Sequence, residues 1–165
     1  MSDSYVVRDG ARKLNFEGDQ LGHVTTRRPS SPRWTELTLY RTVGGSYVFE
    51  KIGRSRLLHM PDCEYLKRRG RQALPRFQDY RTGEDPDHYE YDECVPDEYD
   101  FTLLLTEEDL FSAVVADDAN ALIKALIEEK HGKREIPQLT GSVLSEACGN
   151  DADLNVVMSR EEHIA

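Results

Sequence analysis

The stretch WTELTLYRTVGGSYVFEKI, residues 34–52, carries the clearest structural signal in this chain. Leu37 and Leu39 alternate with more polar neighbours, which is the two-residue period of a half-buried strand. Gly44 and Gly45 tolerate the positive φ angles of a tight turn, and the alternation resumes from Tyr47 onward. The stretch therefore predicts a β-hairpin. A third run, residues 54–59, is expected to continue the meander or to bulge away from it.

Apolar runs further along the chain predict the rest of the fold. Residues 101–106 and 110–116 indicate two short strands, although a helix capped by Thr106 is the alternative for this region. Asp117 or Asp118 is expected to cap a helix over residues 119–130, because apolar residues recur there at positions i, i+3, i+4 and i+7. We expect an α+β fold with an antiparallel sheet, built on a 35–59 hairpin or meander and on strands near 101–116, with helix 119–130 packed on it.

The length of 165 residues suits one domain with extensions. Residues 1–33 are interrupted by glycine and proline, and we expect a peripheral N-terminal extension with at most a short strand at residues 5–7. The α+β domain is expected over residues 34–148, including a short helix at 62–69, a long polar loop at 71–100 and a weaker helix at 142–148. Residues 149–165 are expected to form a frayed C-terminal tail.

Charge is strongly segregated along this chain, whose formal net charge is -10. Residues 51–81 hold nine Lys and Arg against three Asp and Glu, whereas residues 82–123 hold fourteen Asp and Glu and no Lys or Arg. Separated charge creates a field that steers charged partners. The three cysteines have no standard disulfide spacing, and no apolar run is long enough to span a bilayer. We therefore expect a cytoplasmic protein that has no membrane partner.

The acidic segment, defined as residues 84–100, is the predicted partner-binding surface. Its nine carboxylates and three tyrosines present anions where a basic partner expects phosphates, together with rigid contact area. We expect a non-catalytic, acidic protein-binding module for a partner with a basic surface. Its most concrete form is a stoichiometric inhibitor that blocks a nucleic-acid-handling machine by charge mimicry, for example a phage anti-defence protein. The simpler interpretation is a solvated loop that serves solubility. The predicted contact residues are Glu84, Asp85, Asp87, Tyr89, Glu90, Tyr91, Asp92, Glu93, Asp97, Glu98, Tyr99 and Asp100.

Nucleic-acid binding is the first alternative function. The basic segment, defined as residues 54–81, interleaves Arg and Lys with aromatic residues, a composition that binds phosphates and stacks on bases. The simpler interpretation is that these cations pair with the acidic segment within the same chain. The candidate residues for nucleic-acid binding are Arg54, Arg56, Lys67, Arg68, Arg69 and Arg71.

Metal binding and catalysis are the remaining alternatives. His59, Cys63, His88 and Cys94 supply two imidazoles and two thiols, a legitimate ligand set for zinc that would hold a proline-interrupted loop together. Their spacing matches no standard zinc finger, and Cys63 is more simply interpreted as a small buried apolar residue. We therefore expect no cofactor, with zinc as the alternative. An enzyme with a site near His59 and Cys63 is the least favoured interpretation, because no acid is identifiable that would orient the histidine.

Overall fold

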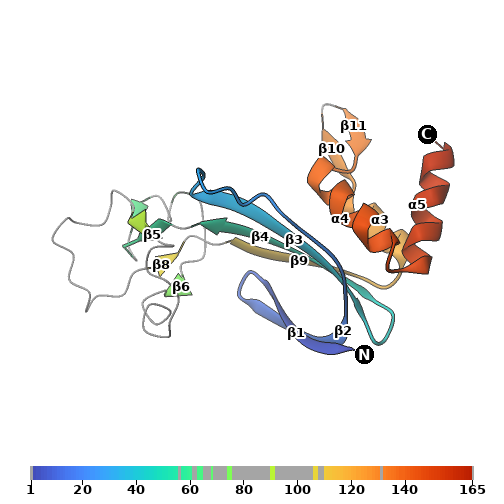
Figure 1. Ribbon diagram of the computed structural model, residues 1–165, viewed down its shortest axis with the longest axis horizontal. Coiled ribbons are helices and arrows are strands. Elements are labelled where there is room, and N and C mark those ends of the chain that lie inside the picture. Colours follow the sequence, from blue (N-terminus) through green and yellow to red (C-terminus); the bar gives the residue numbers. More distant parts are fainter. Residues whose placement is uncertain are drawn as a thin grey trace. The chain divides into compact units, whose positions relative to one another are not determined.

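The predicted hairpin is present in the computed structural model (Figure 1). Its strands are β3 (Arg33–Thr42) and β4 (Tyr47–Ser55), which are neighbours in one sheet. The turn is closed by the backbone bond from Thr42 N–H to the Ser46 carbonyl at 2.8 Å, and Gly45 adopts φ +92°. The third run does not stay in this sheet, because β5 (Leu57–His59) pairs with other strands.

The structure describes residues 2–55, 57–60, 63, 64, 68, 74–75, 90–91, 106–107, 110–130 and 132–164. The chain divides into two compact units. The first comprises residues 1–25, 36–51 and 112–165, and the second comprises residues 26–35 and 52–111. In the described ranges, a five-stranded antiparallel sheet and the helices that follow it confirm the predicted α+β class.

The sheet also contains two N-terminal strands, β1 (Asp3–Asp9) and β2 (Arg12–Thr25). Its strand order is β1-β2-β3-β4-β9, where β9 is Leu110–Ala116. Strand β2 pairs with β1 through residues 12–18 and with β3 through residues 18–25. The expectation of a peripheral extension is therefore wrong for residues 3–25, where Val7 and Leu21 are core residues. Because β2 changes partners and carries a bulge between Gln20 and Gly22, its apolar residues do not keep one regular period.

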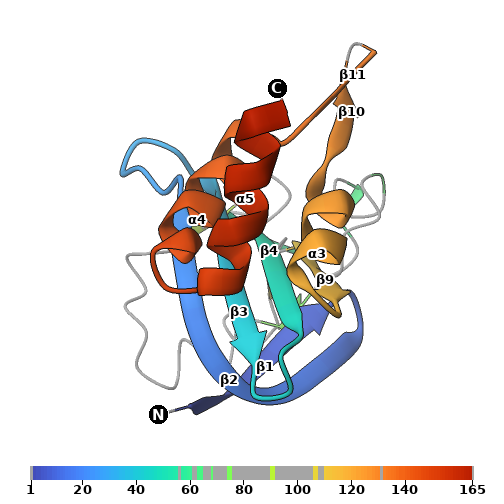
Figure 2. The same cartoon turned by 90° about the vertical axis from the view of Figure 1, so that its right-hand side faces the viewer.

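Three helices cover one face of the sheet (Figure 2). They are α3 (Ala119–Leu126), α4 (Gln138–Cys148) and α5 (Ala152–Ile164). Leu37 and Leu39 share this face because strand residues two apart point to the same side, and they join a core that includes Leu144 and Leu154. Fully burying one leucine side chain contributes roughly 1.5–3 kcal/mol. The prediction of a frayed tail over residues 149–165 is therefore wrong, since α5 supplies part of this core.

The sheet curls, so that its β1–β2 end packs against the opposite face of β3 and β4. Val7, Tyr40 and Val48 form a second buried cluster there. The rings of Tyr5 and Phe16 lie 4.6 and 5.4 Å from the Tyr40 ring, centre to centre, within the range of favourable aromatic pairs. Strand β3 thus places Leu37 and Leu39 in one core and Tyr40 in the other.

The C-terminal elements are of the predicted types, but the boundaries of the helices differ from the prediction. Asp118 caps α3 as predicted, because its Oδ1 accepts the Ala121 N–H at 2.8 Å. The helix ends at Leu126 rather than at residue 130, since β10 (Glu128–Lys130) pairs with β11 (Lys133–Glu135). Gly132, whose position suits a helix cap, instead provides the turn of this hairpin with φ +77°. Strand β9 confirms the predicted strand at residues 110–116, and α4 begins four residues earlier than the helix predicted at 142–148.

The second unit contains a sheet of very short strands in the order β6-β8-β5-β7. Its further members are β6 (Leu74–Pro75), β7 (Glu90–Tyr91) and β8 (Thr106–Glu107). Strand β5 pairs in parallel with β7 and antiparallel with β8. Most of the predicted helix 62–69, most of the polar loop 71–100 and the predicted strand residues 101–105 lie outside the described residues. In the part of the chain that the structure describes, no helix is long and apolar enough to cross a membrane.

Candidate functional site

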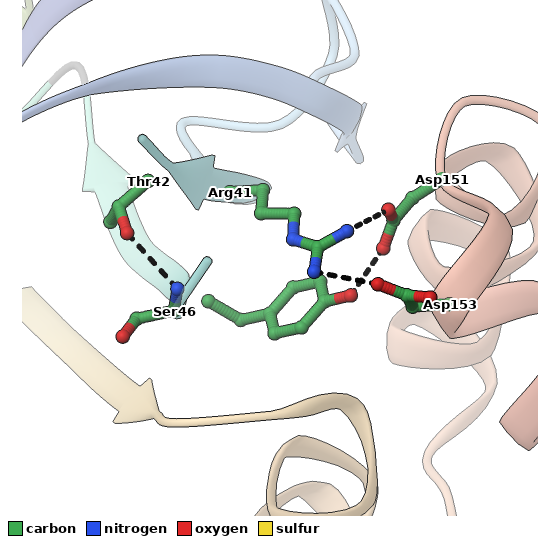
Figure 3. Close-up of polar contacts among 6 residues, drawn as sticks. Arg41, Thr42, Ser46, Asp151 and Asp153 are labelled. Carbon is green, nitrogen blue, oxygen red and sulfur yellow. Dashed lines mark hydrogen bonds and ion pairs between the residues drawn. The ribbon is translucent and has the colours of Figure 1, made fainter. Parts of the chain in front are cut away.

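A charged cluster joins the β3–β4 hairpin to the start of α5 (Figure 3). Arg41, near the end of β3, donates one Nη to Asp151 Oδ1 at 2.6 Å and the other to Asp153 Oδ2 at 2.7 Å. The Tyr47 hydroxyl donates to the second oxygen of Asp151. The Asp151 side chain is 6% exposed, whereas that of Asp153 is 68% exposed. The buried carboxylate is therefore held from two sides, and the exposed one from one side.

Two members of the cluster, Arg41 and Tyr47, have raised pKa values. The hydrogen bond to Asp153 raises the pKa of Arg41 above its ordinary value. Burial raises the pKa of the Tyr47 phenol, and its hydrogen bond to Asp151 raises it further. A guanidinium and a phenol that both hold their protons tightly do not transfer them near neutral pH. The cluster is therefore a structural tie rather than an acid–base pair.

An open pocket of about 390 Å³ lies beside the cluster. It is lined by Asp19, Gln20, Leu21, Arg41, Thr42, Asn150 and Asp151. Asn150 Nδ2 donates to the Leu21 carbonyl at 2.8 Å, and this bond ties the turn before α5 to the bulge of β2. The guanidinium in the pocket wall is already paired with two carboxylates, so the lining offers no uncompensated positive charge that would hold an anion.

This cluster was not predicted, because the last seventeen residues were expected to form a tail. A local signal was present, since Leu154, Val157 and Met158 follow Asp151 at the spacing of one helical face. That pattern indicates a helix with a capping aspartate. The partner of Asp151 was not predictable locally, because Arg41 lies 110 residues earlier in the chain.

The structure brings together His59 and Cys63, two residues of the candidate zinc set. His59 ends β5 and is fully buried, and Cys63 is 6% exposed. The Cys63 N–H donates to the Met60 carbonyl at 3.0 Å, and this turn places Cys63 Sγ 3.6 Å from His59 Nδ1. His88 and Cys94 lie outside the described residues. Within the described ranges, no group of three or more His, Cys, Asp and Glu side chains could hold a metal ion.

Only part of the predicted nucleic-acid surface is described. Arg54 is half-buried in β4, and its guanidinium lies 5.8 Å from the centre of the Phe111 ring, within cation–π distance. Arg68 is exposed. Arg56, Lys67, Arg69 and Arg71 lie outside the described residues. A common basic face therefore stays a prediction.

The acidic segment is described at one point. Glu90 and Tyr91 form β7, which pairs in parallel with Leu57 and Leu58 of β5. The pairing attaches the middle of the segment to the short-stranded sheet of the second unit. The other predicted contact residues lie outside the described part, namely Glu84, Asp85, Asp87, Tyr89, Asp92, Glu93, Asp97, Glu98, Tyr99 and Asp100.

Alkaline titration is expected to destabilise the first unit through its buried tyrosines. Burial, and then the charge of Glu50, raises the pKa of Tyr40 from 10.0 to about 12, and the pKa of Tyr47 is also raised. A phenol with a higher pKa in the folded state binds its proton more tightly there. Its contribution to stability is therefore complete below about pH 10 and is lost as pH rises through the folded pKa. The free energy of unfolding should fall by up to about 1.4 kcal/mol per pH unit for each tyrosine.

Denaturant unfolding measured at intervals between about pH 8 and pH 12 tests this expectation. Tyr40→Phe should make the decline above pH 10 shallower, because one of the titrating phenols is gone. The comparison uses the pH slope of each protein rather than its absolute stability, since the substitution also removes a hydroxyl. An identical slope in wild type and variant would contradict the assignment to Tyr40.

Comparison of the chain with protein-family models, with curated proteins and with solved structures found no match.

Proposed function

We propose that this protein is a non-catalytic binding module that captures a basic protein partner through the acidic segment. The observation that carries the proposal is the composition of residues 84–100, which hold nine carboxylates, three tyrosines and no Lys or Arg. Carboxylates this dense repel one another, and a basic partner relieves that repulsion on binding. The tyrosines supply the large, rigid contact area that is typical of energetically important interface residues.

The pairing of β7 with β5 supports this role. It attaches Glu90 and Tyr91 to the second unit in the middle of the acidic segment. Ordering residues before binding lowers the conformational entropy that binding costs, so this pairing favours binding through Glu90 and Tyr91.

The charged cluster of the first unit also supports it, because that cluster is engaged within the molecule. Arg41 and Tyr47 bond to Asp151, and the exposed Asp153 bonds to the same guanidinium. These groups hold α5 to the hairpin. Because these charged groups are occupied within the first unit, we assign partner recognition to the second unit.

In its most concrete form the protein is a stoichiometric inhibitor that occupies the nucleic-acid site of its partner. Nine carboxylates along one segment can meet the Lys and Arg side chains that otherwise hold phosphates. Inhibition would be competitive with nucleic acid, and it would weaken as added salt screens the charges.

Neutralising part of the acidic segment tests the proposal. The triple variant Asp97→Asn, Glu98→Gln, Asp100→Asn is expected to weaken partner binding at least about tenfold at low salt, which corresponds to about 1.4 kcal/mol. The matched control is Glu17→Gln, Asp117→Asn, Glu146→Gln, which changes net charge equally at exposed positions of the first unit. The measurement is affinity capture from native lysate with and without nuclease treatment, at two salt concentrations, followed by titration of the captured protein.

The outcomes separate three explanations. Loss of binding in the segment variant alone supports the proposal. Equal loss in both variants would mean that net charge and not the acidic segment governs binding, and wild-type affinity in the segment variant would contradict the proposal directly. Recovery of nucleic acid that disappears on nuclease treatment would favour the basic segment as the binding surface instead.

A further inference from the structure

The last strand of the five-stranded sheet carries no charged residue. Strand β9 reads LFSAVVA and ends the strand order, so no other described strand of that sheet pairs with its outer edge. An antiparallel strand directs the backbone groups of alternate residues to opposite sides, and an unpaired edge offers these groups to an added strand. Proteins usually protect such an edge with a charged residue or a proline. Strand β9 contains neither.

A side chain from the other end of the sheet covers the middle of this edge. Asp9 is the last residue of β1, and its Oδ1 accepts the Ala113 N–H at 3.2 Å. Ala113 is the central residue of β9. Because this N–H bonds to a side chain of β1 rather than to β4, it points to the outer edge of β9. The curl of the sheet brings the two residues together, since Ala113 also packs against the cluster of Val7, Tyr40 and Val48.

A second contact orients the carboxylate. Arg12 Nη2 donates to Asp9 Oδ2 at 2.8 Å, so one carboxylate oxygen faces the guanidinium and the other faces β9. The two side chains are 63% and 33% exposed, and an ion pair at such a surface position adds little stability. Its effect is to hold an acceptor oxygen against the Ala113 N–H.

We infer that Asp9 blocks the outer edge of β9 against strand addition, and that the strand it excludes is β9 of a second copy of this chain, an inference that does not rest on the proposed function. An added strand needs the Ala113 N–H as a donor for one of its own carbonyls, and it has to displace Asp9 to reach that group. The carboxylate also repels an approaching carbonyl oxygen, because that oxygen carries a partial negative charge.

A second copy suits this edge because β9 can pair with itself. In an antiparallel pair centred on Ala113, the two Ala113 residues exchange their N–H···O bonds, and Ser112 lies opposite Val114. No like charges meet in this pairing, whereas two chains of formal net charge -10 repel each other elsewhere. Val115 is 52% exposed, and pairing would cover part of its apolar surface.

Self-association of the full-length chain tests the blocking role of Asp9. In sedimentation equilibrium Asp9→Ala should dimerise with an association constant at least about tenfold above that of wild type, because two N–H groups per dimer become available. Asp9→Asn keeps an acceptor oxygen and should dimerise less than Asp9→Ala. The matched control is Asp3→Ala, because Asp3 has the same charge and is exposed at the other end of β1. Wild-type association of Asp9→Ala would overturn the inference, as would an equal gain in Asp3→Ala or in Asp9→Asn.

A second substitution locates the surface between the two copies. Lysine on an edge strand opposes strand addition, so Asp9→Ala, Val115→Lys should return to the association constant of wild type. The matched control is Asp9→Ala, Val6→Lys, because Val6 is an exposed apolar residue of β1 at the other edge of the sheet. This control should still dimerise. Dimerisation that persists with Val115→Lys, or that is lost with Val6→Lys, would overturn β9 as the binding edge.

Hydrogen exchange of the wild-type protein gives a result that does not depend on whether a variant folds. Ala113 and Val115 are two residues apart and direct their N–H groups to the same side of β9. Only the first is covered by Asp9, so the Ala113 amide should exchange at least about tenfold more slowly than the Val115 amide. Equal exchange rates would show that Asp9 does not hold this N–H and would overturn the inference.

Discussion

Replacing Asp151 with alanine is expected to lower the free energy of unfolding by about 2–4 kcal/mol, whereas Asp153→Ala should cost less than about 1 kcal/mol. Both carboxylates bond to the guanidinium of Arg41, at 2.6 and 2.7 Å. They differ in exposure, because Asp151 is 6% exposed and Asp153 is 68% exposed. Without Asp151 the buried Tyr47 hydroxyl loses its acceptor, and Arg41 loses its better-shielded partner. Water readily replaces Asp153.

Chemical denaturation near neutral pH measures both costs, and a double-mutant cycle identifies their source. If the unsatisfied hydroxyl causes much of the loss, Asp151→Ala should cost less in a Tyr47→Phe background than in wild type. We expect a coupling energy of about 0.5–2 kcal/mol between the two positions. Equal costs for Asp151→Ala and Asp153→Ala would show that burial does not distinguish these ion pairs.

The elements that sequence analysis predicted correctly are those with local signals. In the hairpin the alternating residues, the two glycines and the returning strand all lie within residues 34–52. In β3, Leu37 and Leu39 face one core and alternate with the more polar Thr38 and Tyr40, so the strand is visible in the local sequence. The cap of α3 was predictable for the same reason, because Asp118 and Ala121, whose N–H its side chain accepts, lie within one turn.

The N-terminal strands were missed because their pairing is not encoded in a regular local pattern. Strand β2 pairs with β1 before Gly18 and with β3 after it, and Leu21 sits in the bulge that follows. A strand that changes partners also changes which face is buried. Its apolar residues then lose the alternation by which a strand is recognised.

Candidate sites can be proposed from the sequence where composition is unusual, and contacts between distant residues cannot. The acidic segment is visible from its charge alone, and the approach of Cys63 to His59 spans only four residues. The bond between Arg41 and Asp151 spans 110 residues and depends on the whole first unit being folded. No local pattern specifies such a contact, because neither an Arg nor an Asp in the sequence indicates which distant residue it will meet.

Gly18→Ala is expected to destabilise the protein by about 3 kcal/mol or more. Gly18 is buried where β2 passes from β1 to β3, opposite both Asp3 and Thr42. A Cβ atom built on Gly18 would lie 2.1 Å from the Arg41 carbonyl oxygen and 2.9 Å from the Thr42 Cα. Both atoms belong to the backbone of a central strand, so neither can move aside as the end of a side chain would.

Gly44→Ala provides the matched control, because its Cβ would meet only Thr42 Oγ1 at 3.8 Å and its φ is not positive. This variant should change the free energy of unfolding by less than about 1 kcal/mol. Denaturant midpoints of the two variants measure the difference. Relief of the clash requires β2 and β3 to separate at the position of Arg41, so Gly18→Ala should also weaken the tie to α5. Asp151→Ala would then cost less in the Gly18→Ala background, whereas near wild-type stability of Gly18→Ala would show that the strands part here without loss.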